Sequence, residues 1–212
     1  MTDSNYTHIL AIVDRSGSMG AGNVYLEMQN ALNTFFEEQA AVDGKCLVDY
    51  YQFDTSYNKV YEDTPVADAK AVIEPRGMTA LLDALGRGTV DLGKKLAAKS
   101  EDDRPGKVLV VVVTDGMENS SREYTADAVK ALVEKQQDEY NWDYVFLGAN
   151  MDAVAVGGLY GFKQDKSLTF NIYDGESVVA TASALSGYTT AYRGGAAAAF
   201  SDEDRKNANK KS

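Results

Sequence analysis

The chain has 212 residues, of which 44% are hydrophobic, and this length and composition predict a single domain with one sizeable core. Its formal net charge is −11 and its isoelectric point is near 4.6, so we exclude nucleic acids and anionic membranes as partners. Cys46 is the only cysteine, which excludes an internal disulfide and a zinc site built on thiolates.

The start of the chain lacks the basic and apolar regions of a signal peptide. The longest apolar run, residues 108–113, is too short to cross a bilayer. We therefore expect a soluble protein of the cytoplasm.

Strand-like and helix-like segments alternate along the first half of the chain. A buried strand is predicted over residues 7–13, and large apolar residues then recur at helical spacing over 28–36. Residues 45–53 alternate in the manner of a second strand, and residues 59–61 predict a short third one. Leucines at helical spacing predict a helix over about 79–99.

The clearest strand of the sequence is residues 108–113, which are six consecutive aliphatic residues. Such a run is typical of a central parallel strand that is covered on both faces. A helix follows, with its apolar face between Val129 and Tyr140, and Ser120 and Glu123 have the spacing of a capping box just before it.

The remaining pattern predicts a strand over 142–147, a short helix over 153–159, a strand over 168–172 and a helix over about 176–190. Residues 201–212 are charged and polar, and we expect a disordered tail there. The whole order predicts one α/β domain over residues 5–200. Its six-stranded, mostly parallel sheet would be doubly wound, with helices on both faces.

Oxygen-bearing side chains stand where two of the buried strands end. Asp14, Ser16 and Ser18 follow the first strand at alternate positions, and Asp115 follows the strand over 108–113. If these two strands are neighbours, their carboxyl ends meet at one edge of the sheet, which Thr79 can also reach. Oxygen ligands of this kind suit a small hard cation, above all Mg²⁺.

These motifs resemble the von Willebrand factor A (vWA) family with a metal-ion-dependent adhesion site. The family signature is D-x-S-x-S after the first strand, a Thr before the third helix and an Asp after the fourth strand. Residues 14–18 (DRSGS), Thr79 and Asp115 match it in that order. The resemblance covers about residues 5–200, nearly the whole chain.

The resemblance implies a binding mechanism without catalysis. Ser16, Ser18 and Thr79 would bind Mg²⁺ (or Mn²⁺) through their hydroxyl oxygens, with Asp14 and Asp115 close by, largely through ordered waters. One coordination position would stay open for an Asp or Glu of a partner protein. A divalent bridge of this kind lets an acidic protein bind an acidic residue.

Residues near the five metal positions could shape the choice of partner. We name this group the predicted rim, and it consists of Arg15, Met19, Asp54, Met78, Glu118, Asn119 and Arg122. Residues 114–121 and 146–153 further resemble stand-alone vWA proteins of bacteriophages and bacteria. If the chain is phage-encoded, its compartment would be the host cytoplasm.

Two other classes of function stay open. Acidic residues at strand ends also serve Mg²⁺-dependent phosphohydrolases, although these usually carry a second Asp two positions after the first, where this chain has Ser16. A structural subunit with a metal-stabilised homo-oligomer is the other alternative. Nucleotide-binding glycine motifs are absent from the loop after the first strand. His8, the only histidine, lies inside the first strand and is expected to pack in the core rather than act as a base.

Overall fold

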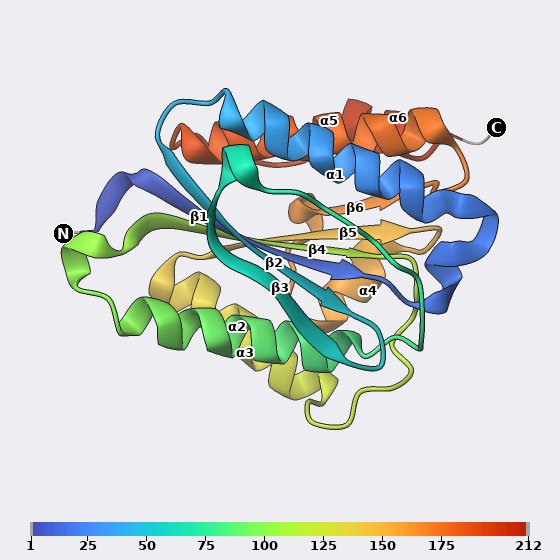
Figure 1. The fold of residues 1–212 in the computed structure, drawn as a ribbon, viewed down its shortest axis with the longest axis horizontal. Coiled ribbons are helices and arrows are strands. Elements are labelled where there is room, and N and C mark those ends of the chain that lie inside the picture. Colours follow the sequence, from blue (N-terminus) through green and yellow to red (C-terminus); the bar gives the residue numbers. More distant parts are fainter. Residues whose placement is uncertain (1, 211–212) are drawn as a thin grey trace.

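The computed structural model describes residues 2–210, without the side chains of residues 21–23, and its centre is one six-stranded sheet (Figure 1). The strand order is β3-β2-β1-β4-β5-β6, and every neighbouring pair is parallel except β2 and β3. The predicted fold class is thereby confirmed. The strands are β1 (Asp3–Asp14), β2 (Lys45–Phe53), β3 (Tyr57–Pro65), β4 (Pro105–Thr114), β5 (Asp143–Ala149) and β6 (Ser167–Phe170).

Helices cover both faces of the sheet, and each face has its own apolar core. One face carries α1 (Val24–Ala40), α5 (Gly175–Arg193) and α6 (Asp202–Ala208), which lie above the sheet in Figure 1. The other face carries α2 (Leu81–Ala97), α3 (Ala126–Tyr140) and α4 (Ala153–Leu159). Among the described helices, none has the length and apolar character needed to cross a bilayer.

The two central strands explain where a ligand could bind. β1 pairs with β2 on one side and with β4 on the other, so the order of strands reverses between β1 and β4. Val13 pairs with Val113, which brings the next residues, Asp14 and Thr114, to the same edge of the sheet. Ligands of doubly wound sheets bind at such a reversal, beyond the carboxyl ends of the strands.

The edge strand β3 is longer and more irregular than the predicted strand over 59–61. Its antiparallel pairing with β2 shifts register on both sides of Tyr50, as it does at a β-bulge. Asp63 takes a left-handed backbone conformation there, with φ of 49°. Most side chains of β3 are exposed or half-buried, so its sequence has no continuous apolar run from which its full length could be predicted.

The start of α3 differs from the expected capping box. The helix begins at Ala126, and its N-cap is Thr125, whose side-chain oxygen accepts the N–H of Ala128 at 3.2 Å. Ser120 and Glu123 lie in the loop before it, and the Glu123 carboxylate instead pairs with Arg87 on α2. The capping-box prediction at these two residues was therefore wrong, because a long-range ion pair uses the glutamate.

The expected disordered tail contains a helix. α6 occupies residues 202–208 and starts with a capping box between Ser201 and Asp204. Ala208 is fully buried, and its carbonyl accepts the N–H of Asn171 at 3.0 Å just after β6. Arg205 also donates to the carbonyls of Ser167 and Gln164, at 2.8 and 2.9 Å. Burial of one small apolar residue and several hydrogen bonds thus order a segment that is otherwise polar. Residues 211–212 of the expected tail lie outside the described residues.

One buried arginine fixes the end of α5. The guanidinium of Arg193 donates hydrogen bonds to the backbone carbonyls of Gln39, Val42, Asp43 and Gly44, at 2.5 to 3.3 Å. These carbonyls belong to the end of α1 and to the turn before β2. Arg193 therefore joins the end of α5 to the turn between α1 and β2. This turn lies where β2 begins, whereas Asp14 lies where β1 ends.

Candidate metal centre

Asp14, the last residue of β1, is fully buried and held from two sides. Its Oδ1 accepts the backbone N–H of Ser16 at 2.6 Å, and its Oδ2 accepts the hydroxyl of Thr114 at 2.6 Å. Thr114 is the last residue of the neighbouring strand β4. The carboxylate is thus fixed where the two central strands end.

A row of hydrogen-bonded oxygens joins the loops that follow β1 and β4. The Oγ atoms of Ser16 and Ser18 lie 3.0 Å apart, and the hydroxyl of Ser18 donates to Asp115 Oδ1 at 2.8 Å. Ser16 is buried whereas Ser18 is exposed, so the row runs from the interior to the surface. The structure therefore brings the two serines together with Asp115.

Thr79 reaches the same space from the loop before α2. A Cβ atom added at Gly116 would lie 2.7 Å from Thr79 Oγ1 and 3.5 Å from Asp14 Oδ2, so only a glycine leaves room between them. Asn119 holds the threonine in place: its Oδ1 accepts the N–H of Thr79 and its own N–H donates to the Thr79 carbonyl, both at 3.0 Å. All five predicted metal positions consequently lie at one edge of the sheet.

The charge at this edge is negative and unbalanced. Within residues 2–210, neither Asp14 nor Asp115 has a lysine, arginine or histidine nitrogen within 4.0 Å. Burial raises the pKa of Asp14 to about 6, even though the hydrogen bonds from Thr114 and Ser16 act in the opposite direction. Burial also raises the pKa of Asp115. Two desolvated carboxylates among neutral hydroxyls form a donor set that fits a hard divalent cation.

Part of the predicted rim is buried, which corrects that prediction for Arg15, Met19 and Asp54. The Nε atoms of Arg15 and Arg76 both donate to Asp54 Oδ2 at 2.9 Å. Burial of Asp54 alone would raise its pKa, but Arg76, the N–H of Ser56 and Arg15 together lower it. Asp54 is therefore a structural anion that joins two loops, and it is not a surface contact.

Glu118 also faces inward. Its Oε2 accepts the N–H of Leu82 in the first turn of α2 at 2.9 Å, and its Oε1 accepts the N–H groups of Ser120 and Ser121. The exposed members of the predicted rim are Met78, Asn119 and Arg122. Met117, two residues before Asn119, is also exposed. It was not part of the predicted rim, although its position directly after Asp115-Gly116 was a visible signal.

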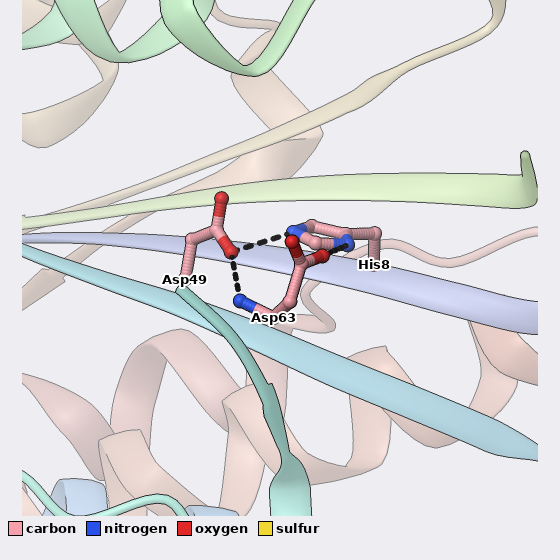
Figure 2. A group of neighbouring side chains, drawn as sticks. All are labelled: His8, Asp49 and Asp63. Carbon is pink, nitrogen blue, oxygen red and sulfur yellow. Dashed lines mark hydrogen bonds and ion pairs between the residues drawn. The ribbon is translucent and has the colours of Figure 1, made fainter. Parts of the chain in front are cut away.

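A second group of possible ligands lies between β1, β2 and β3, with two buried members and one exposed member (Figure 2). His8, Asp49 and Asp63 each offer one ligand atom within 4.8 Å of the others. His8 Nε2 lies 3.1 Å from Asp49 Oδ1, while His8 Nδ1 lies 3.0 Å from the hydroxyl of Tyr6. Asp49 Oδ1 also accepts the N–H of Asp63 at 2.8 Å.

Two lysines, one in the last turn of α2 and one just after the helix, already neutralise these carboxylates. Lys95 contacts Asp49 Oδ2 and lies 3.5 Å from Asp63 Oδ2, and Lys99 lies 3.2 Å from Asp63 Oδ1. Burial alone would raise the pKa of Asp49, but His8 and Lys95 hold it below the usual range. A metal ion would have to displace both ammonium groups, so this group is better explained as a buried ion-pair network.

No protein-family model matches the sequence, and no curated protein matches it. Solved structures do. Over 87% of this chain, a proximal thread matrix protein of the mussel byssus superposes with a TM-score of 0.61 at 13% identity, and a von Willebrand factor type A protein of Catenulispora acidiphila with 0.60 at 15%. The von Willebrand factor domain of the type V pili tip protein Mfa5 from Porphyromonas gingivalis gives 0.61 at 9% identity, over 85% of this chain and 94% of that one.

The chain has the vWA fold. Three neighbours superpose over at least 85% of the chain, and two of them are named for von Willebrand factor domains. The chain spans less than half of the mussel and Catenulispora proteins, 46% and 42% of their lengths. The mussel protein has also been solved with zinc in its metal-ion-dependent adhesion motif, at 16% identity to this chain. At these identities the likeness establishes the vWA fold, while the metal site depends on the geometry described above.

Proposed function

We propose that this vWA domain binds Mg²⁺, or Mn²⁺, at the edge where β1 and β4 end. The observation that carries the proposal is the pair of carboxylates, buried Asp14 and half-buried Asp115, which have no cationic partner among the described residues and are linked through Ser16 and Ser18. Ser16, Ser18 and Thr79 would offer hydroxyl oxygens directly. The two carboxylates would hold the ion's water ligands.

Because three of these ligands are neutral hydroxyl groups, the bound ion would be able to accept a further, negatively charged ligand. When bound, the ion supplies a Lewis-acidic position that can accept a carboxylate. The hydroxyls of Ser16, Ser18 and Thr79 are neutral, so they leave most of the ion's charge uncompensated. An Asp or Glu from a partner protein would complete its coordination. This explains how a chain with a net charge of −11 would attract an acidic partner residue.

The geometry favours this binding role over phosphoryl chemistry. Both oxygens of Asp14 already accept hydrogen bonds, from Ser16 and from Thr114, which leaves the carboxylate poorly placed to attack phosphorus. The residue two positions on is Ser16, so the second acid of a phosphohydrolase pair is missing. The names of several structural neighbours, a byssus matrix protein, a minor pilin and a pilus tip protein, also suit a non-enzymatic role. The cytoplasm and a phage origin stay predictions from the sequence.

Calorimetric titration with Mn²⁺ tests the proposal, because Mn²⁺ accepts oxygen sites with less demand on geometry than Mg²⁺. We expect one site in the wild type and no measurable site in Asp14→Ala. Asp138→Ala, an exposed carboxylate on α3, is the matched control and should bind as the wild type does. Equal binding by Asp14→Ala and the wild type would refute the site.

The alternative of a metal-stabilised homo-oligomer has its own test. Light scattering in Mg²⁺ and in EDTA would show a change of mass if the ion joins copies of this chain. A constant mass, together with metal binding, would favour a hetero-partner.

A further inference from the structure

Two exposed methionines stand next to the candidate metal ligands. Met78 directly precedes Thr79 and is 52% exposed, and Met117 lies two residues after Asp115 and is 57% exposed. Of the nine large apolar side chains that are exposed in residues 2–210, these two are the only methionines. The apolar surface at this edge therefore comes from the most flexible of the large apolar side chains.

The backbones that carry these methionines are fixed relative to each other. Asn119, two residues after Met117, is hydrogen-bonded twice to Thr79, so the two loops run side by side. The N–H of Met78 donates to Thr55 Oγ1 at 3.0 Å. Gly77 before it has a positive φ of 71°, which turns the chain sharply at this point. The thioether side chains are thus the free part of an otherwise ordered edge.

Exposed apolar side chains beside a polar site typically belong to a protein interface. Methionine suits such a surface because its unbranched, polarisable side chain adapts to partners of different shape. The other residues of the predicted rim offer no apolar contact, since Arg15 and Asp54 are buried and Glu118 is bonded to backbone N–H groups. Asn119 and Arg122 are exposed but polar. Met78 and Met117 are consequently the apolar contacts that a partner would meet first.

We propose that the partner presents an Asp or Glu with a large aliphatic or aromatic residue two positions before or after it, and that this residue packs on Met78 and Met117. In an extended segment, side chains two positions apart lie on the same side, about 7 Å from each other. One side chain could then reach the ion while the other covers the methionines. This inference rests on the proposed function and adds a second requirement to it.

A displayed library of random dodecapeptides gives the test. Peptides would be selected on the immobilised full chain in Mg²⁺ and eluted with EDTA. Relative to the unselected library, we expect enrichment of Asp or Glu with Leu, Ile, Phe, Met or Trp two positions before or after it. A synthetic peptide of the enriched type should bind the double variant Met78→Gln/Met117→Gln about tenfold more weakly than the wild type, or ~1.4 kcal/mol.

The controls separate the two levels of the proposal. The double variant should bind Mn²⁺ as the wild type does, and Tyr140→Gln, an exposed residue at the far end of α3, should bind the peptide normally. Enriched acidic peptides without an apolar preference, or equal binding by the double variant, would overturn the role of the methionines and leave the proposed function standing. If Mn²⁺ binds but EDTA elutes no acidic peptide, the capture of a carboxylate is refuted and this inference falls with it.

Discussion

Replacing Gly116 by alanine should impair metal binding through a single steric contact. The added methyl group would lie 2.7 Å from Thr79 Oγ1, whereas ordinary van der Waals contact begins at 3.4 Å. Gly116 does not have a positive φ, so alanine can adopt its backbone conformation without strain. The hydroxyl of Thr79 must therefore retreat by about 0.7 Å, or rotate away at a cost of about 0.5–1.5 kcal/mol.

The loop cannot follow this movement easily, because both backbone groups of Thr79 are bonded to Asn119. Mg²⁺ requires oxygen ligands at about 2.0–2.1 Å in near-octahedral geometry, and a shift of ~0.7 Å removes a ligand from that range. We expect the affinity for the ion to fall about 10- to 100-fold, equivalent to about 1.4–2.8 kcal/mol.

Calorimetry with Mn²⁺ measures this loss, and a double-mutant cycle shows its origin. If the methyl group acts through Thr79, the combination Thr79→Ala/Gly116→Ala should bind no more weakly than Thr79→Ala alone. Gly187→Ala on α5 is the matched control, since an added Cβ there meets nothing within 4 Å. Wild-type affinity in Gly116→Ala would refute the reasoning that Thr79 is a ligand.

Four further outcomes follow from these contacts. Because burial raises the pKa of Asp14 to about 6, the Mn²⁺ affinity should fall as the pH decreases, towards about tenfold per unit below pH 6, in titrations between pH 5 and 7.5. In the metal-free chain Asp14 itself acts in the opposite sense, since the stabilisation from its protonated form is complete below its ordinary pKa and is lost as the pH rises through about 6. Urea unfolding in EDTA of the wild type against Asp14→Asn separates this contribution from carboxylates with a lowered pKa such as Asp49, and a stability advantage of the wild type that increases with pH would contradict it. Asp49→Asn removes the buried carboxylate that contacts Lys95, but Lys95 keeps Asp63 at 3.5 Å, so the free energy of unfolding should fall by about 1–3 kcal/mol with Mn²⁺ binding intact; an unchanged free energy of unfolding would contradict the ion-pair interpretation. Glu118→Ala should cost about 1–3 kcal/mol in the same assay, because the N–H of Leu82 loses its acceptor, and an unchanged midpoint would disprove that role.

The sequence predicted the central sheet well because its strands are buried on both faces. The aliphatic run over 108–113 lies within β4, and the alternating segment over 45–53 coincides with β2. A strand that is buried on both faces is hydrophobic along its whole length, so the sequence alone shows where it lies. The convergence of Asp14 and Asp115 also followed from the sequence, because it required only that β1 and β4 be neighbours.

The features that the sequence could not predict depend on long-range contacts. The carboxylate of Glu118 bonds to the first turn of α2, 36 residues earlier, and no local pattern signals that partner. Asp54 looked exposed as a loop residue, yet Arg15 and Arg76 compensate its charge and permit its burial. The helix α6 depends on the burial of Ala208 against the end of β6. This contact could not be predicted from the polar composition of the segment.

The two outer strands of the sheet, β3 and β6, are both unsuited to pairing with an added strand. β3 is bulged, rich in charged side chains and interrupted by the left-handed residue Asp63, and such features block the pairing of a foreign strand. β6 has only four residues, and α6 bonds to the chain directly after it. Both outer strands therefore resist the addition of a seventh strand, whether from a partner or from a second copy of this chain. The proposed capture of a partner carboxylate at the loops beyond β1 and β4 needs no strand addition, so it is compatible with outer strands of this kind.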